Sequence, residues 1–223
     1  ELLRGIVARY NLTLIEDAAE SLGSFIGDCH TGRFGRAGVL SFNGNKTITT
    51  GGGGAIITDD ELFARRLRHL TTTARAGDGT ELIHDAVGFN YRMPNLNAAL
   101  GCAQLETLDS KLKSKQILAA RYADALEGLE GVSTVTHPKW GRSNYWLNAV
   151  LFETQQARNA AFSELNEAGY QCRAVWTPLH HMPMYCDNPR MGLSVTEDLS
   201  ARGLLLPSGA GLLLSEASSS TDR

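Results

Sequence analysis

A lysine on a turn rich in small residues is the part of this sequence with the clearest potential for chemistry. Lys46 follows an apolar, strand-like segment, residues 39–43, and precedes four consecutive glycines, residues 51–54. Most lysines are solvated surface charges. An amine at the end of a buried strand can instead be held against a cofactor, where it can carry an aldehyde as an imine. We therefore interpret Lys46 as a Schiff-base lysine.

Carboxylates at the end of a second strand supply the matching partner. Residues 12–15 form an apolar run that predicts a buried strand, and Asp17 follows it closely. Ligands of open α/β sheets bind outside the carboxyl ends of the strands, so we expect Asp17 and Lys46 to face one pocket. Pyridoxal phosphate needs both groups, because a carboxylate keeps its ring nitrogen protonated while a lysine carries its aldehyde. Ser41, five residues before Lys46, would offer its hydroxyl to the phosphate.

Five ordered segments resemble the DegT/DnrJ/StrS family of nucleotide-sugar aminotransferases, from residue 12 to about residue 207. They are Glu16-Asp17-Ala18-Ala19-Glu20, Ser41-Phe42 with Lys46, the glycine run 51–54 with Ala55-Ile56-Ile57-Thr58, Gly88-Phe89-Asn90-Tyr91-Arg92-Met93-Pro94-Asn95, and Pro178-Leu179-His180. The resemblance implies an α/β fold of the fold-type I pyridoxal-phosphate enzymes. It places the remainder of the cofactor-binding domain, with its mostly parallel sheet, in residues 1–110. A connecting helix and a small α+β domain would occupy residues 111–214, and a disordered tail residues 215–223.

The resemblance also implies roles for individual residues. Asp17 would pair with the pyridine nitrogen, Glu20 would lie beside the ring, Ser41 would bind the phosphate and Lys46 would carry the cofactor. Asn90 would reach the phosphate of a neighbouring subunit's cofactor, which implies a homodimer with shared active sites. Three further residues are assigned to substrate binding by the resemblance alone: Arg92, His180 and Tyr185.

The implied reaction converts a nucleotide-linked keto-deoxysugar to an amino sugar, with glutamate as donor, in amino-sugar or polysaccharide biosynthesis. Family members commonly have a glutamate within the glycine run, whereas this chain has four glycines. That variant is more similar to the subgroup that acts on legionaminic-acid-type and perosamine-type precursors. Family chains also contain additional residues before the position that corresponds to residue 1, so the sequence is expected to be an N-terminally truncated fragment.

Bulk composition excludes several other classes of function. A net charge of −3 and a pI near 6.1 provide no general basic field for nucleic acid. No apolar run approaches the roughly 20 residues that span a bilayer. The four cysteines are scattered without a Cys-x-x-Cys pair, which argues against a disulfide framework or zinc site and favours reduced thiols in the cytoplasm.

The sequence does not favour a metal site near the end of the chain. Its ligands would be His180, His181, Cys186 and Asp187. Neighbouring side chains of an extended segment point to opposite sides, so the two histidines are expected to diverge. The sequence therefore predicts no bound metal.

Periodicity predicts the remaining elements. We expect a strand at residues 55–58, and then a helix capped by Asp59 or Asp60. A long helix should begin near Pro94 and run to about residue 126, with a break. A strand at residues 144–152, a helix at 156–168 stopped by Gly169 and a strand at 170–175 should complete the small domain.

Three rival functions compete with the aminotransferase. A phosphate-binding P-loop fails on spacing, because Asn45 separates Gly44 from Lys46 and Val39 occupies the position of the earlier glycine. A sugar dehydratase of related architecture would replace the lysine by histidine, and Lys46 argues against it. A non-catalytic binding or assembly module with the same fold stays open as the alternative, with the fragment itself inactive.

Overall fold

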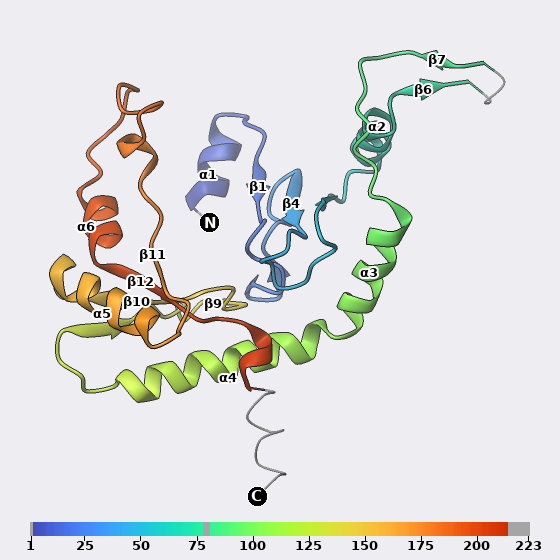
Figure 1. Cartoon of the computed structure of the whole chain (residues 1–223). Helices are drawn as coiled ribbons and strands as arrows, with labels where there is room; N and C mark the ends of the chain where they lie inside the picture. The colour runs from blue at the N-terminus through green and yellow to red at the C-terminus, as the bar shows by residue number, and fades with distance from the viewer. Residues whose placement is uncertain (1, 78–80, 214–223) are drawn as a thin grey trace, which may run out of the picture. The chain divides into compact units, whose positions relative to one another are not determined.

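The computed structural model describes residues 2–77 and 81–213, which form two compact units (Figure 1). The first unit runs to Ser110 and also contains Pro138–Asn144, and the second holds Lys111–His137 and continues from Tyr145. The tail predicted to be disordered, residues 215–223, lies outside the described residues.

The first unit is built on a mixed sheet of three strands in the order β1-β4-β5. β1 (Ile15–Asp17) pairs in parallel with β4 (Ala37–Ser41), which pairs antiparallel with β5 (Gly54–Ile57). The strands predicted at residues 12–15 and 39–43 correspond to β1 and β4, but their bounds differ from the predicted ones. The strand placed at residues 12–15 begins only at Ile15 and includes Asp17, because its pairing with β4 runs from Ile15 opposite Ala37 to Asp17 opposite Val39.

The connection between β1 and β4 packs closely against the sheet. Gly32 has a φ of +97°, and a Cβ there would lie 3.0 Å from the Ala18 Cβ. A Cβ on Gly35 would lie 2.5 Å from the Leu14 carbonyl oxygen. Glycine is thus required for this close approach. The same connection supplies two strands of a small antiparallel sheet, β2 (Phe25–Ile26) and β3 (Cys29–His30), and β9 (Gly141–Arg142), from much later in the chain, pairs with β2.

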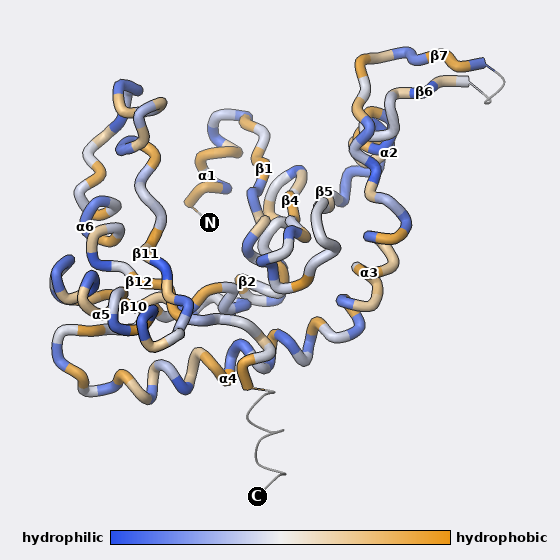
Figure 2. Tube along the Cα trace, viewed as in Figure 1, coloured by the Kyte–Doolittle hydropathy of each residue, from blue (hydrophilic) through white to orange (hydrophobic). Residues whose placement is uncertain are grey.

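Helices and a hairpin complete the first unit. They are α1 (Leu2–Arg9), α2 (Glu61–Thr71), the hairpin of β6 (Arg75–Ala76) and β7 (Ile83–His84), and α3 (Asn95–Glu106). The predicted cap of α2 is confirmed at Asp60, whose side chain accepts the Phe63 N–H at 2.9 Å. Figure 2 shows hydrophobic residues along α1, where Leu2 and Leu3 are 88% and 68% exposed.

α4 (Leu108–Leu126) follows α3 after Thr107, which confirms the predicted long helix and its break. In the second unit, four antiparallel strands form a sheet. Their order is β11 (Arg173–Ala174), β12 (Gly203–Leu206), β10 (Asn148–Phe152) and β8 (Val132–Thr134). Val150, Cys172 and Leu204 form its buried core, with exposed fractions of 4% or less.

The other elements of the second unit are helical. They are α5 (Gln155–Glu167), the 3₁₀ helix η1 (Leu179–His181), α6 (Ser194–Arg202) and the 3₁₀ helix η2 (Ala210–Leu213). Gly169 follows α5 with a φ of +90°, a left-handed conformation that confirms the predicted stop. No helix in the described part of the chain is long and apolar enough to cross a bilayer.

Candidate active site

Two of the predicted cofactor residues lie at one edge of the first unit's sheet. β1 and β4 are parallel, so their carboxyl ends meet at the same edge. Asp17 ends β1 opposite Val39, and Ser41 ends β4 two residues further along. Asp17 is exposed, and its Oδ1 accepts the Ala19 N–H at 3.1 Å, which orients one carboxylate oxygen toward the chain that follows the strand.

Lys46 lies on a loop that hydrogen bonds close at its base. The Phe42 N–H donates to the Gly53 carbonyl at 2.9 Å, and the Thr50 N–H donates to the Phe42 carbonyl at 3.0 Å. The Lys46 side chain is only 12% exposed, and its Nζ forms a hydrogen-bonded ion pair with Glu20 Oε1. This pair joins the loop after β4 to the segment after β1. Asp17 and Ser41 thus end paired strands, and Glu20 and Lys46 lie on the segments that follow them; these four residues are the constellation at the carboxyl edge.

Packing beneath the loop fixes its path. Thr50 is 2% exposed, and its carbonyl accepts a 2.6 Å hydrogen bond from Asn97 Nδ2 of α3. Gly51 and Gly53 have φ values of +80° and +101°, which glycine adopts without the steric cost that a side chain would impose. The glycine run is therefore a constrained turn at these two positions, and it returns the chain into β5.

Glu16 is a structural carboxylate that the sequence did not single out. Its Oε1 accepts the N–H groups of Phe34 and Gly35 at 2.6 and 2.7 Å, and its Oε2 accepts that of Gly32 at 2.7 Å. Neighbouring residues of a strand point to opposite faces, so Glu16 can bind this loop while Asp17 remains exposed. The available signal was a carboxylate on the strand followed by a glycine-rich loop.

Asn144 is a second residue that sequence reasoning missed. It is 3% exposed, and its Nδ2 donates to the carbonyl oxygens of Glu20 and Leu22 at 2.8 and 2.9 Å. Its backbone N–H also donates to Ser24 Oγ at 3.0 Å. Asn144 thus holds the backbone that carries Glu20. It lies 124 residues further along the chain, and no local pattern predicts that contact.

The remaining predicted site residues lie away from this constellation in the chain. Asn90 forms an isolated bridge with Thr72, and both Asn90 and Arg92 are exposed on the segment after β7. His180 and Tyr185 belong to the second unit, where Tyr185 is 44% exposed. Their roles toward a partner subunit or a sugar stay predictions.

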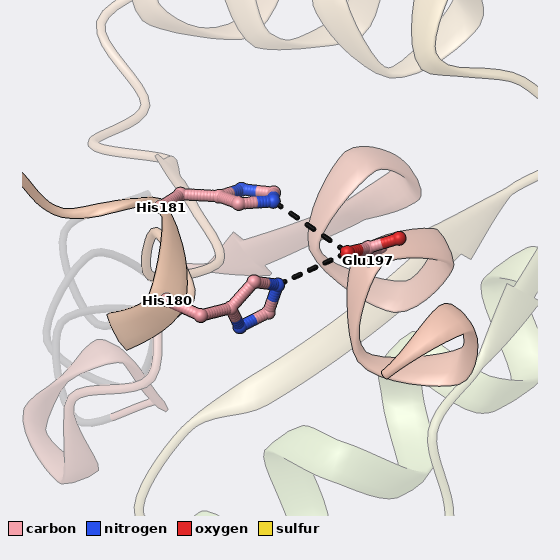
Figure 3. A group of neighbouring side chains, drawn as sticks. All are labelled: His180, His181 and Glu197. Carbon is pink, nitrogen blue, oxygen red and sulfur yellow. Dashed lines mark hydrogen bonds and ion pairs between the residues drawn. The ribbon is translucent and has the colours of Figure 1, made fainter. Parts of the chain in front are cut away.

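The expectation that the adjacent histidines diverge is wrong. Residues 179–181 form the 3₁₀ helix η1, so the extended-chain argument does not apply to them. The His180 and His181 rings lie 4.3 Å apart between centroids, and both point toward Glu197 of α6 (Figure 3).

The sequence profile of the DegT/DnrJ/EryC1/StrS aminotransferase family matches residues 1–219. The chain belongs to this family. The predicted resemblance is therefore confirmed. Among similar proteins is EpsN of Bacillus subtilis, whose name provisionally describes a pyridoxal phosphate-dependent aminotransferase. EpsN is 38% identical over 209 residues, which cover 91% of this chain and 53% of EpsN.

Two further proteins are similar to this chain. GDP-perosamine synthase of Escherichia coli O157:H7 is 36% identical over 198 residues, which cover 89% of this chain and 53% of the synthase. A crystal structure of a DegT/DnrJ/EryC1/StrS aminotransferase from Brucella abortus is 29% identical with a TM-score of 0.85, and the match covers 98% of this chain and 57% of that one. The predicted α/β class of fold-type I is confirmed. The chain spans about half the length of these curated relatives.

Proposed function

We propose that the protein carrying this chain is a pyridoxal-phosphate-dependent aminotransferase that converts a nucleotide-linked keto-deoxysugar to an amino sugar. The observation that carries the proposal is the shielded Lys46 amine, ion-paired with Glu20 beside the strand that ends in Asp17. Family membership supports the reaction class. The name of the Escherichia coli relative, GDP-perosamine synthase, supports a nucleotide-sugar product.

The donor set at the carboxyl edge fits pyridoxal phosphate. Asp17 supplies an exposed carboxylate for the ring nitrogen, Lys46 an amine for the aldehyde, and Ser41 a hydroxyl for the phosphate. When bound, pyridoxal phosphate supplies an electron-accepting ring that stabilises the charge left after a proton leaves the amino-acid carbon. Asp17 would keep the ring nitrogen protonated and so maintain that capacity.

Lys46 has a second task in this proposal. When it is uncharged and not engaged by the cofactor, its Nζ would be able to take the proton from the α-carbon of the amino acid. Glu20 holds Nζ in the present structure, so the amine is oriented before the cofactor binds. The packing of Thr50 fixes the backbone of the loop that carries Lys46, which would keep the amine close to the reacting carbons.

Finer features of the function rest on the family. We infer glutamate as the amino donor, and a cytoplasmic homodimer in which Asn90 completes the phosphate site of the other subunit. Arg92, His180 and Tyr185 would contact the sugar nucleotide. The exposure of Asn90 and Arg92 supports a role in contacts outside their own unit.

Reductive labelling tests the central assignment. Borohydride should bleach the visible absorbance of the intact, cofactor-loaded protein and leave the label on the peptide that contains Lys46. Lys113, an exposed lysine of α4, is the matched control and should stay unlabelled. Asp17→Asn should keep part of the cofactor binding and slow turnover on the order of 10²-fold or more, as losing one preorganised charge does elsewhere. A label on another lysine, or wild-type turnover in Asp17→Asn, would contradict the assignment.

A further inference from the structure

A second group of chemically active side chains lies in the second unit. His180 Nε2 and His181 Nε2 lie 3.1 and 3.7 Å from Glu197 Oε1 (Figure 3). One ligand atom from each of the three side chains falls within 4.8 Å of the others. The histidines come from η1 and the glutamate from the first turn of α6, so two separate elements converge on one point.

Both elements are anchored. In α6, Arg202 Nη1 donates to the Phe152 carbonyl of β10 at 2.6 Å, and the Ala201 carbonyl accepts from Arg158 Nε of α5 at 3.0 Å. Ser200 Oγ of α6 donates to the Trp176 carbonyl at 3.1 Å, just before η1. These bonds hold α6 against both the sheet and the segment that carries the histidines. The spacing of the three side chains is therefore set by the fold.

The spacing suits a small tetrahedral ion. Zn²⁺ binds imidazole nitrogen at about 2.0–2.1 Å and carboxylate oxygen at about 2.0–2.2 Å, which places neighbouring ligand atoms roughly 3.3 Å apart. The separations of 3.1 and 3.7 Å between the histidine nitrogens and Glu197 Oε1 bracket that value. Only 9% of the His180 side chain is exposed, whereas His181 and Glu197 are half exposed, so an ion has a path of entry.

We propose that His180, His181 and Glu197 form a binding site for a divalent transition-metal ion of the Zn²⁺ class. Two histidines with one glutamate are a ligand set that proteins use for zinc, with a fourth position left to water or another ligand. Mg²⁺ and Ca²⁺ bind weakly here, because they require oxygen ligands and the site offers two nitrogens. Without a metal, Glu197 Oε1 forms a hydrogen bond with His180 Nε2 and lies 3.7 Å from His181 Nε2.

Zn²⁺ titration calorimetry of the intact, chelator-treated protein tests the site, with the cofactor state held constant. The wild type should bind one Zn²⁺ per chain at this site, and Glu197→Gln and His181→Asn should each weaken that binding about tenfold or more. Added Mg²⁺ should not compete. His69→Asn is the matched control, because His69 also pairs with a carboxylate, Asp85 at 2.6 Å, but belongs to no group of three possible ligands among the described residues.

The Zn²⁺ affinities of the wild type and the three variants decide whether the site exists. Loss of Zn²⁺ affinity in Glu197→Gln and His181→Asn, with wild-type affinity in His69→Asn, supports the site. His181 is half exposed, so its variant keeps the test valid if Glu197→Gln fails to fold. Equal Zn²⁺ affinity in all four proteins, or no stoichiometric binding by the wild type, overturns the proposal. Aminotransferase activity does not enter the readout, so the proposed function is tested independently.

Discussion

At the scale of single residues, two shielded lysines show why burial alone does not indicate catalysis. Lys46 is paired with a carboxylate on the segment that follows Asp17, where a substrate or cofactor could reach it. Lys115 is 4% exposed and donates instead to two backbone carbonyls, those of Trp146 at 3.1 Å and Ser208 at 2.5 Å. Burial lowers the pKa of Lys115 to about 8. Its partners identify Lys115 as a structural residue.

This lowered pKa gives a stability prediction with a definite sign. Between about pH 8 and 10.5, the unfolded chain holds more protons at Lys115 than the folded chain, so this residue's contribution to the free energy of unfolding rises with pH. Urea unfolding at several pH values should measure this effect. Across that window, the free energy of unfolding of the wild type should rise relative to that of Lys115→Met by up to about 1.4 kcal/mol for each pH unit. Other titrating groups, such as Cys172, are present in both proteins, so their contributions cancel when the two free energies of unfolding are subtracted. Lys113→Met, at an exposed position of α4, should show no such gain, and a flat difference for Lys115→Met would refute the prediction.

At the scale of elements, Glu16 links strand β1 to the loop that leads into β4. Three backbone N–H groups converge on its two oxygens within 2.7 Å, and glycines bring that loop against β1. The strand that ends in Asp17 is therefore held from the side opposite to the candidate cofactor site. We expect Glu16 to position the candidate site without taking part in its chemistry.

Replacing Glu16 with Gln should show whether the loop that leads into β4 depends on this carboxylate. An amide places an N–H₂ group where Oε2 or Oε1 accepted an N–H, so at least one donor is left unpaired, at a cost of about 1–3 kcal/mol in the free energy of unfolding. Hydrogen exchange should accelerate at Gly32, Phe34 and Gly35, and cofactor affinity should fall. Glu106→Gln, at an exposed position of α3, serves as the control. Unchanged exchange at these three amides would show that Glu16 does not hold the loop.

The elements also show what a sequence can predict. The α2 cap, the break between α3 and α4, and the stop at Gly169 follow from local residue types, and the structure confirms them. The β2, β3 and β9 strands have two residues each, too short for a period to appear, and β9 pairs with a strand more than a hundred residues earlier. Lys46 and Asp17 could be proposed from the sequence because local patterns mark them. The contact between Asn144 and Glu20 could not, because it joins residues far apart in the chain.

At the scale of the whole molecule, the chain exposes apolar surface that a stable protein would cover. Leu2, Ile6 and Ile15 in the first unit are 88%, 48% and 51% exposed, and α1 has no buried residue. β1 and β5 are edge strands within the described sheet, and unpaired strand edges promote association between chains. The match covers only 53% of EpsN and of the synthase, so these relatives contain further chain.

The 223-residue chain expressed alone should therefore differ from the intact protein. We expect it to self-associate, because nothing in the described part of the chain covers the apolar face of α1 or the strand edges. We also expect little or no pyridoxal phosphate binding and no glutamate-dependent turnover. A phosphate dianion is usually held by several donors, and within one subunit the predicted set offers only the hydroxyl of Ser41. Light scattering, cofactor absorbance and a transamination assay, run beside the intact protein, check the three expectations. A monodisperse 223-residue chain with stoichiometric cofactor and measurable turnover would show that these residues suffice for the active site.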